Sequence, residues 1–148
     1  MGTSNPKREE DLRFCKFGTV SFTKITKVNT FIDYLENGKV MATRCKGCDE
    51  IFFPPRADCC HCLSSDMQWD EITGNGTLIS YSQLKFAPIG FDADLPYTIA
   101  LLDYGEFNVF GRIAADVPAS ELKIGMPMKV ISNVLSNGQL NYVFQKAG

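Results

Sequence analysis

Four cysteines in two closely spaced pairs constrain this chain more than any other feature of its sequence. Cys45 and Cys48 form one Cys-x2-Cys pair, Cys59 and Cys62 form the other, and ten residues separate the pairs. Each pair can bend around one point as a knuckle, and two facing knuckles place four sulfurs at the corners of a tetrahedron, which suits Zn²⁺. Four thiolates leave no coordination position open for water or substrate. The spacing therefore predicts a structural zinc site rather than a catalytic one.

Three other states of these cysteines compete with zinc. A tetrahedral site of four cysteines does not exclude iron, as in a rubredoxin-like centre, and an empty site is also open. Disulfides are disfavoured, because no apolar signal segment precedes the pairs and cytosolic thiols stay reduced. Asp49 and Leu63 follow the two knuckles where glycine is common. Cys60 and His61 are further possible ligands, but we expect both to be bystanders beside the four cysteines.

The composition is that of an ordinary globular chain. The 148 residues are 45% hydrophobic and 22% charged, with a net charge of −2. This length fits one domain, or a small module attached to another. The charge lacks the basic excess that nucleic acids or anionic membranes demand, and no apolar run approaches the roughly 18 residues of a membrane span. We therefore expect a cytoplasmic protein that has no membrane partner.

The pattern along the chain predicts three parts and a mainly β fold. Residues 1–28 form an arm, of which residues 1–12 are charged and are expected to be a frayed tail. For residues 13–28, which hold several phenylalanines, we favour extended structure that could pack on a partner or on its own domain. Residues 29–69 hold the cysteine ribbon after a short helix, which Asn29 or Thr30 can cap and Gly38 can end.

Residues 70–148 form the third part, which is rich in strand patterns separated by turn signals. Five strands with one helical turn between the third and the fourth match an OB-fold barrel. We expect the strands at residues 77–85, 97–102, 107–114, 128–134 and 140–145, and the helical turn at residues 117–125.

The side chains needed for catalysis by this chain alone are scarce. Thiolytic cleavage requires a nucleophilic cysteine and a base to activate it. Cys15 and Cys60 are the only thiols outside the metal pairs, and His61, the only histidine, lies inside a knuckle. No Gly-x-Ser-x-Gly motif, phosphate loop or dinucleotide fingerprint is present. We expect any reaction to depend on a different polypeptide.

Binding of single-stranded nucleic acid is the alternative function that an OB-fold raises. Such binding requires a basic groove with stacking aromatic side chains. Residues 71–148 contain five Lys and Arg but seven Asp and Glu. Because backbone binding depends on contacts between cations and phosphates, this balance disfavours nucleic acid as a partner.

The ribbon with its Phe-Phe-Pro-Pro-Arg segment is followed by GNGTLISYS, LPYTIALLDYGE, FGRI and LKIGMPMKV. Over about residues 30–146 the chain thereby resembles the family that joins a rubredoxin-like zinc ribbon to an OB-fold. Members of that family are small accessory subunits of thiolase-superfamily enzymes. Within the family, the chain looks most similar to zinc-finger subunits of thiolases that act on benzoylsuccinyl-CoA in anaerobic aromatic degradation.

The resemblance implies a hetero-oligomer in which a thiolase-like partner supplies the catalytic residues. It also implies that coenzyme A or an acyl-CoA is a ligand of this complex. Its diphosphate and its extended pantetheine arm would then need residues that bind them. The candidates for CoA binding or for the partner interface are Phe53, Arg56, Lys85, Phe91 and Arg112. Considered one at a time, Lys85 and Arg112 are also consistent with ordinary solvated charges on strands.

Overall fold

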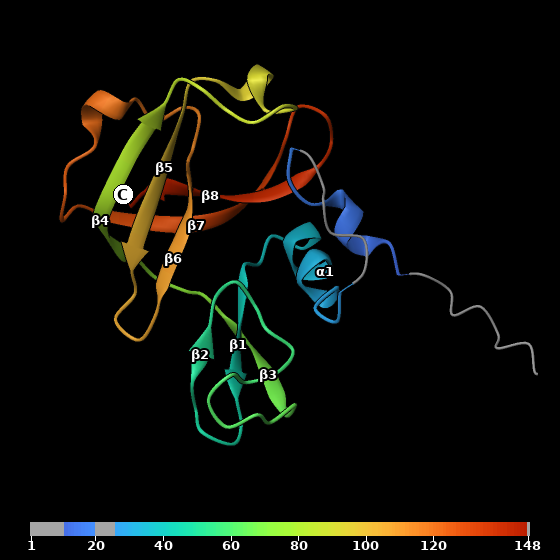
Figure 1. The fold of residues 1–148 in the computed structure, drawn as a ribbon. Coiled ribbons are helices and arrows are strands. Elements are labelled where there is room, and N and C mark those ends of the chain that lie inside the picture. Colours follow the sequence, from blue (N-terminus) through green and yellow to red (C-terminus); the bar gives the residue numbers. More distant parts are fainter. Residues whose placement is uncertain (1–10, 20–25, 148) are drawn as a thin grey trace, which may run out of the picture.

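The structure is a computed structural model that describes residues 11–19 and 26–147. A three-stranded sheet lies at one end of the molecule and a β-barrel at the other, with the helix α1 beside the connection between them (Figure 1). The mainly β fold predicted from the sequence, a ribbon followed by a five-stranded barrel, is confirmed.

The ribbon sheet is built from β1 (Met41–Cys45), β2 (Ile51–Phe52) and β3 (Met67–Glu71). β1 is central and pairs antiparallel with both neighbours. No strand was predicted over residues 67–71, although Met67 and Trp69 alternate there with the polar Gln68 and Asp70. β3 is a strand because it pairs with β1 along its whole length, from Met41 opposite Glu71 to Cys45 opposite Met67.

The barrel closes in the order β4-β5-β6-β8-β7, with β6 and β8 as its parallel pair. Its interior is apolar because residues on alternate positions point inward: along β5, Thr98, Ala100 and Leu102 are buried, whereas the residues between them are only half-buried. A 3₁₀ turn, η3 (Ala119–Glu121), separates β6 from β7, where the sequence predicted a helical turn. The strands are β4 (Gly76–Leu84), β5 (Tyr97–Asp103), β6 (Asn108–Ile113), β7 (Pro127–Val134) and β8 (Leu140–Lys146).

The helix α1 (Thr30–Glu36) buries Phe31, Ile32 and Leu35. It ends at Gly38, which takes the left-handed conformation with φ +79°. The predicted cap is wrong: the side chain of Asn29 makes no capping bond and instead donates its amide to the carbonyl of Thr26 at 2.6 Å. A helix of seven residues is too short to be stable alone, so packing of its apolar face holds it.

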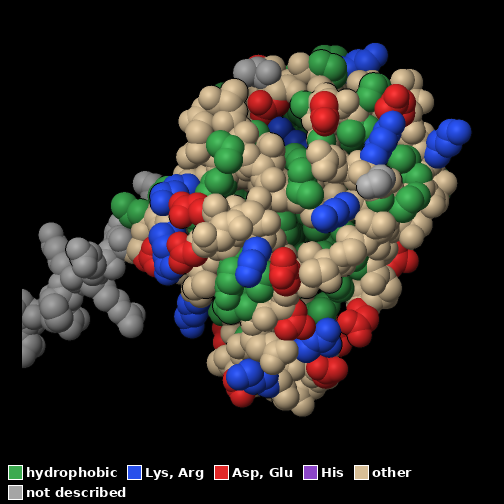
Figure 2. All heavy atoms as spheres, turned by 180° about the vertical axis from the view of Figure 1, so that it is seen from behind, with side chains coloured by type: hydrophobic (Ala, Val, Ile, Leu, Met, Phe, Trp, Pro, Cys, Tyr) green, Lys and Arg blue, Asp and Glu red, His purple; other side chains and the backbone are tan. Residues whose placement is uncertain are grey.

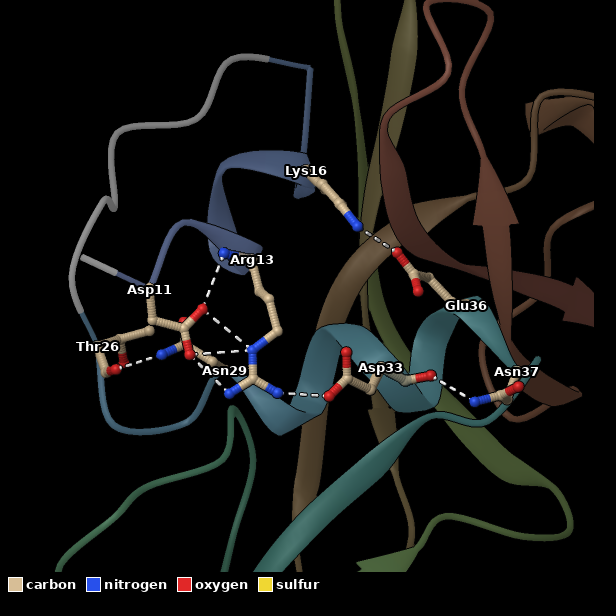
Figure 3. A network of polar contacts seen from close by, with 8 residues as sticks. All are labelled: Asp11, Arg13, Lys16, Thr26, Asn29, Asp33, Glu36 and Asn37. Carbon is tan, nitrogen blue, oxygen red and sulfur yellow. Dashed lines mark hydrogen bonds and ion pairs between the residues drawn. The ribbon is translucent and has the colours of Figure 1, made fainter. Parts of the chain in front are cut away.

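The part of the arm that the structure describes packs on its own chain. The extended structure favoured there is wrong for residues 13–16, which form the 3₁₀ turn η1 (Arg13–Lys16); residues 20–25 lie outside the described ranges. Arg13 bonds to Asp33 of α1 at 2.5 Å, and Lys16 bonds to Glu36 at 2.8 Å (Figure 3). The ring of Phe17 lies 5.9 Å from that of Phe31. These contacts tie the arm to α1.

Two contacts fix the ribbon against the barrel. The guanidinium of Arg44 on β1 bonds to Asp70 on β3 at 2.7 Å and to Glu106, in the turn between β5 and β6, at 3.1 Å. Phe53, which follows β2, packs edge-on against Tyr142 on β8 with their ring centroids 5.1 Å apart. Polar and apolar contacts thus both hold the ribbon to the barrel.

Candidate metal centre and barrel surface

The four predicted cysteines come together at one end of the ribbon. Their Sγ atoms all lie within 4.8 Å of one another, and Cys45 and Cys59 are buried while Cys48 and Cys62 are exposed. Two of the distances are 3.4 Å, from Cys45 to Cys62, and 3.5 Å, from Cys48 to Cys59. Four sulfurs at about 2.3 Å from one Zn²⁺ would be about 3.8 Å apart. The donor set and its spacing therefore fit a tetrahedral zinc ion, and the site is structural.

The two knuckles have the same backbone turn although neither carries the usual glycine after it. Asp49 donates its N–H to the carbonyl of Cys45 at 2.8 Å, and Leu63 donates to that of Cys59 at 3.1 Å. Both donors adopt the left-handed conformation, Asp49 with φ 65° and Leu63 with φ 62°. That conformation is costly for a side chain such as leucine. The knuckles therefore impose the turn on residues that do not favour it.

The second knuckle stabilises a thiolate. The backbone N–H groups of Cys62 and His61 point at the Sγ of Cys59, at 3.5 and 3.4 Å. These donors lower the pKa of the Cys59 thiol to about 6 against the opposing effect of its burial. Zinc binds the thiolate, so the bonds favour the ligating form. The other two candidates lie outside the cluster: Cys60 is exposed, and the His61 ring stacks on Phe52 at 6.1 Å.

The five residues predicted for CoA or partner binding do not form one cluster. Phe53 is half-buried in its packing against the barrel. Arg56 is exposed on the ribbon, with its guanidinium 5.5 Å from the centre of the Phe52 ring. Phe91 and Arg112 lie together on the barrel, and Lys85 is exposed directly after the end of β4. Binding of CoA or of a partner by these residues stays a prediction.

Arg112 is the centre of a small constellation on the outer face of the barrel. Its guanidinium lies 4.1 Å from the ring centre of Tyr97 and 5.6 Å from that of Phe91, and it bonds to Asp94 at 2.9 Å. Asp94 also accepts a bond from Thr19 of the arm, and these two donors hold its pKa below the ordinary value although burial opposes them. The arm therefore reaches the same face of the barrel as Arg112.

Two adjoining cavities meet at Arg112. One, of about 430 Å³, is lined mainly by apolar side chains that include Phe17, Phe110 and Tyr142. The other, of about 600 Å³, has a more polar lining. Tyr97, Arg112 and Asn141 belong to both. Sequence reasoning found Phe91 and Arg112 but missed Asp94, Tyr97 and Tyr142, which no motif connects.

Charges of both signs are interspersed over the surface seen from behind (Figure 2). Such a surface lacks the single-sign field that steers a polyanion. Within the described residues, no helix is both long enough and apolar enough to cross a membrane.

A saturated four-cysteine knuckle pair joined to a five-stranded barrel defines the class: a structural zinc ribbon joined to an OB-fold barrel. Residues 33–68 match the family described as "ChsH2, rubredoxin-like zinc ribbon domain", and residues 69–131 match "ChsH2, C-terminal OB-fold domain". The chain belongs to this family, which confirms the resemblance to a family that joins a zinc ribbon to an OB-fold, and the zinc assignment.

Relatives and a solved structure are similar to the chain over most of its length. It is 29% identical over 94 residues to a "DUF35 domain-containing scaffold protein" of Methanocaldococcus jannaschii, covering 62% of this chain and 66% of that protein. It is 27% identical over 105 residues to a "Probable enoyl-CoA hydratase alpha subunit" of Thermomonospora curvata, covering 70% of this chain but 33% of that one.

The solved structure is described as "Ltp2-ChsH2(DUF35) aldolase". It matches with a TM-score of 0.70 at 22% identity, covering 85% of this chain and 99% of that one. At this identity the likeness establishes the fold.

Proposed function

We propose that this chain is a non-catalytic accessory subunit that scaffolds a thiolase-like catalytic partner acting on a β-ketoacyl-CoA. The observation that carries the proposal is the saturated metal site: all four clustered thiols serve as ligands, so the zinc offers no position for a substrate. The names of the relatives support it, since one is called a scaffold protein and another a subunit of an enzyme acting on an acyl-CoA.

The thiols outside the metal site support the same conclusion. Cys15 is half-buried under the arm, and its carbonyl accepts a bond from Gln139 at 2.7 Å. The only histidine of the chain, His61, is held on the ribbon against Phe52. A cysteine nucleophile needs a base within hydrogen-bond reach. Among the described residues this pairing is absent, so the nucleophile and base are assigned to the partner. Oligonucleotide binding draws no support from the comparisons.

The finer parts of the proposal concern the substrate and the coenzyme. The substrate we infer is benzoylsuccinyl-CoA, on the resemblance stated above, and the setting is the cytoplasm. For the coenzyme, we assign phosphate binding to Arg112, which lines both cavities, and to Lys85, which follows the end of β4, and Phe91 would cover the pantetheine arm. The division into an arm of residues 1–28, a helix and ribbon of 29–69 and a barrel of 70–148 is proposed with it.

Co-expression with a thiolase-like chain tests this function. We expect a complex that elutes as one species and cleaves benzoylsuccinyl-CoA with free CoA, whereas the isolated small chain does not turn over. Turnover by the small chain alone would refute the scaffold assignment. Lys85→Ala and Arg112→Ala complexes should bind acyl-CoA more weakly than wild type, with Lys129→Ala, a cation on β7, as the matched control. Unchanged affinity would remove the coenzyme role and leave the scaffold role standing.

A further inference from the structure

The second half of β4 is an open edge in an otherwise closed barrel. β4 pairs with β5 as far as Leu84, but it pairs with β7 only at Gly76 and Thr77. Leu78 adds one further pair of bonds, to Gly125 at 2.7 Å and to Met126 at 2.9 Å. Beyond Leu78, within the described part of the chain, no backbone–backbone hydrogen bond joins β4 on the side away from β5, although the side-chain hydroxyl of Tyr81 donates to the carbonyl of Leu122 at 3.3 Å. About half of this strand therefore has one unpaired side.

The direction of the unpaired groups follows from the alternation of the ladder. Tyr104 donates its N–H toward β6 at 3.0 Å, so Leu101, three residues earlier on β5, directs its groups toward β4. Leu101 lies opposite Ser80, just after the register shift that marks a bulge. Ser80 therefore bonds to β5, and the N–H and C=O groups of Tyr81 and Gln83 point outward. These four groups form the free edge.

This edge lacks the features that normally prevent strand addition. Exposed edges usually carry lysine, proline or a short length. From Gly76 to Leu84 the strand has no charged residue and no proline. Exposed apolar side chains flank it: Ile79 sits in the bulge, and Phe86 and Ile89 in the loop that follows are 89% and 94% exposed. An uncharged edge with apolar flanks is a surface for a polypeptide in extended conformation.

We propose that this edge binds an extended segment of the catalytic partner, which adds a strand to the barrel beside β4. The proposal rests on the scaffold function and names the surface through which it acts. Alternating N–H and C=O groups are matched by another strand, and its apolar side chains would cover Phe86 and Ile89. Pairing of this edge with the same edge of a second copy of the chain fits less well. The bulge at one end of the free edge and Lys85 at the other would limit such β4–β4 pairing to about five residues. A segment of another chain can continue along the loop.

Gln83→Pro, with Gln83→Ala as its matched control, tests the proposal. Proline removes the outward N–H of this edge position but no bond to β5, so the barrel is expected to fold. Both variants lose the same side chain. In titrations with the thiolase-like chain that co-purifies with the protein, we expect Gln83→Pro to raise the Kd about tenfold or more and Gln83→Ala to change it less than twofold. Zinc content and the thermal midpoint check that both variants are folded.

Hydrogen exchange supplies a second measurement that needs no variant. The amides of Tyr81 and Gln83 should exchange rapidly in the isolated chain and become protected in the complex. Equal affinities for the two Gln83 variants, or protection confined to other elements, would overturn the edge as the docking site while leaving the scaffold function intact. A concentration-dependent homodimer abolished by Gln83→Pro would assign the edge to a second copy and also overturn it. A wild-type chain that binds no thiolase-like protein would overturn both proposals.

Discussion

Gly111→Ala should destabilise the protein through one aromatic ring. Gly111 lies in β6, and a Cβ added there would be 2.7 Å from Cε2 of Tyr142 and 3.0 Å from Cζ of Phe144. The ring of Tyr142 would have to move by about 0.7 Å to restore an ordinary contact. It is held on its other side by Phe53, with ring centroids 5.1 Å apart, and its hydroxyl donates to the carbonyl of Phe110 at 2.8 Å.

The magnitude is set by two opposed effects. Inserting a methyl group into a packed site costs about 1–3 kcal/mol. Replacing glycine by alanine inside a strand returns about 0.5–1 kcal/mol of backbone entropy, and Gly111 has no left-handed conformation to lose. We expect a net loss of about 1–2 kcal/mol in the free energy of unfolding, which lowers the thermal midpoint by about 3–8 °C for a chain of this length.

A double-mutant cycle with Tyr142→Ala isolates the cause. Chemical denaturation should show that Gly111→Ala costs about 1–2 kcal/mol in the wild-type background and clearly less once the Tyr142 ring is removed, when only the contact with Phe144 remains. The m-value should stay constant through the series, as a test of two-state behaviour. A Gly111→Ala variant as stable as wild type, or a cost that persists unchanged without the Tyr142 ring, would refute the steric reasoning.

Three further predictions concern the metal, the pH dependence and the junction of ribbon and barrel. Chelation of zinc should unfold the ribbon, because metal binding and folding are coupled in such sites. The single tryptophan, Trp69 on β3, reports this unfolding by its fluorescence. Unchanged emission after verified loss of zinc would contradict the coupling. Burial raises the pKa of Tyr142 to about 12, above its value near 10 in the unfolded chain. The free energy of unfolding should therefore stay constant below pH 10 and fall between pH 10 and pH 12. Denaturation at a series of pH values would show this fall, and it should be smaller in the Tyr142→Phe variant. Arg44→Met should lower the free energy of unfolding by about 1–2 kcal/mol, because Asp70 and Glu106 lose their ion-pair partner. Arg44→Lys should lower it less. A thermal midpoint of Arg44→Met equal to that of wild type would argue against the bridge.

Features encoded within a few residues were predictable from the sequence. The four cysteines reveal the metal site because their spacing is itself the chemistry of the ligands. The last two strands were predicted at residues 128–134 and 140–145, and the Asn137-Gly138 pair between them favours a tight turn, in which Gly138 takes φ +83°. The barrel strands were placed by their alternation, which the inward- and outward-facing positions impose.

Features that depend on distant partners were not predictable in the same way. β3 is a strand because β1 pairs with it along its whole length, since the alternation in its own sequence covers only four residues, from Met67 to Asp70. Phe53 looked like an exposed contact residue beside two prolines, but Phe31 and Tyr142 enclose it from other parts of the chain. The Arg112 constellation draws on β5, β6, η2 (Asp92–Asp94) and the arm, so no local pattern could assemble it.

The metal site and the barrel face communicate through Tyr142. Zinc fixes the knuckles at one end of the ribbon, and the ribbon carries Phe53, which packs on the Tyr142 ring. Phe17 of the arm also stacks on that ring, with the centroids 6.1 Å apart, and Tyr142 lines the cavity that Arg112 shares. An ion that takes no part in chemistry can thus set the position of a wall of the barrel cavity. This gives the metal a physical role beyond the ribbon itself, because the ribbon holds one side chain of the cavity wall in place.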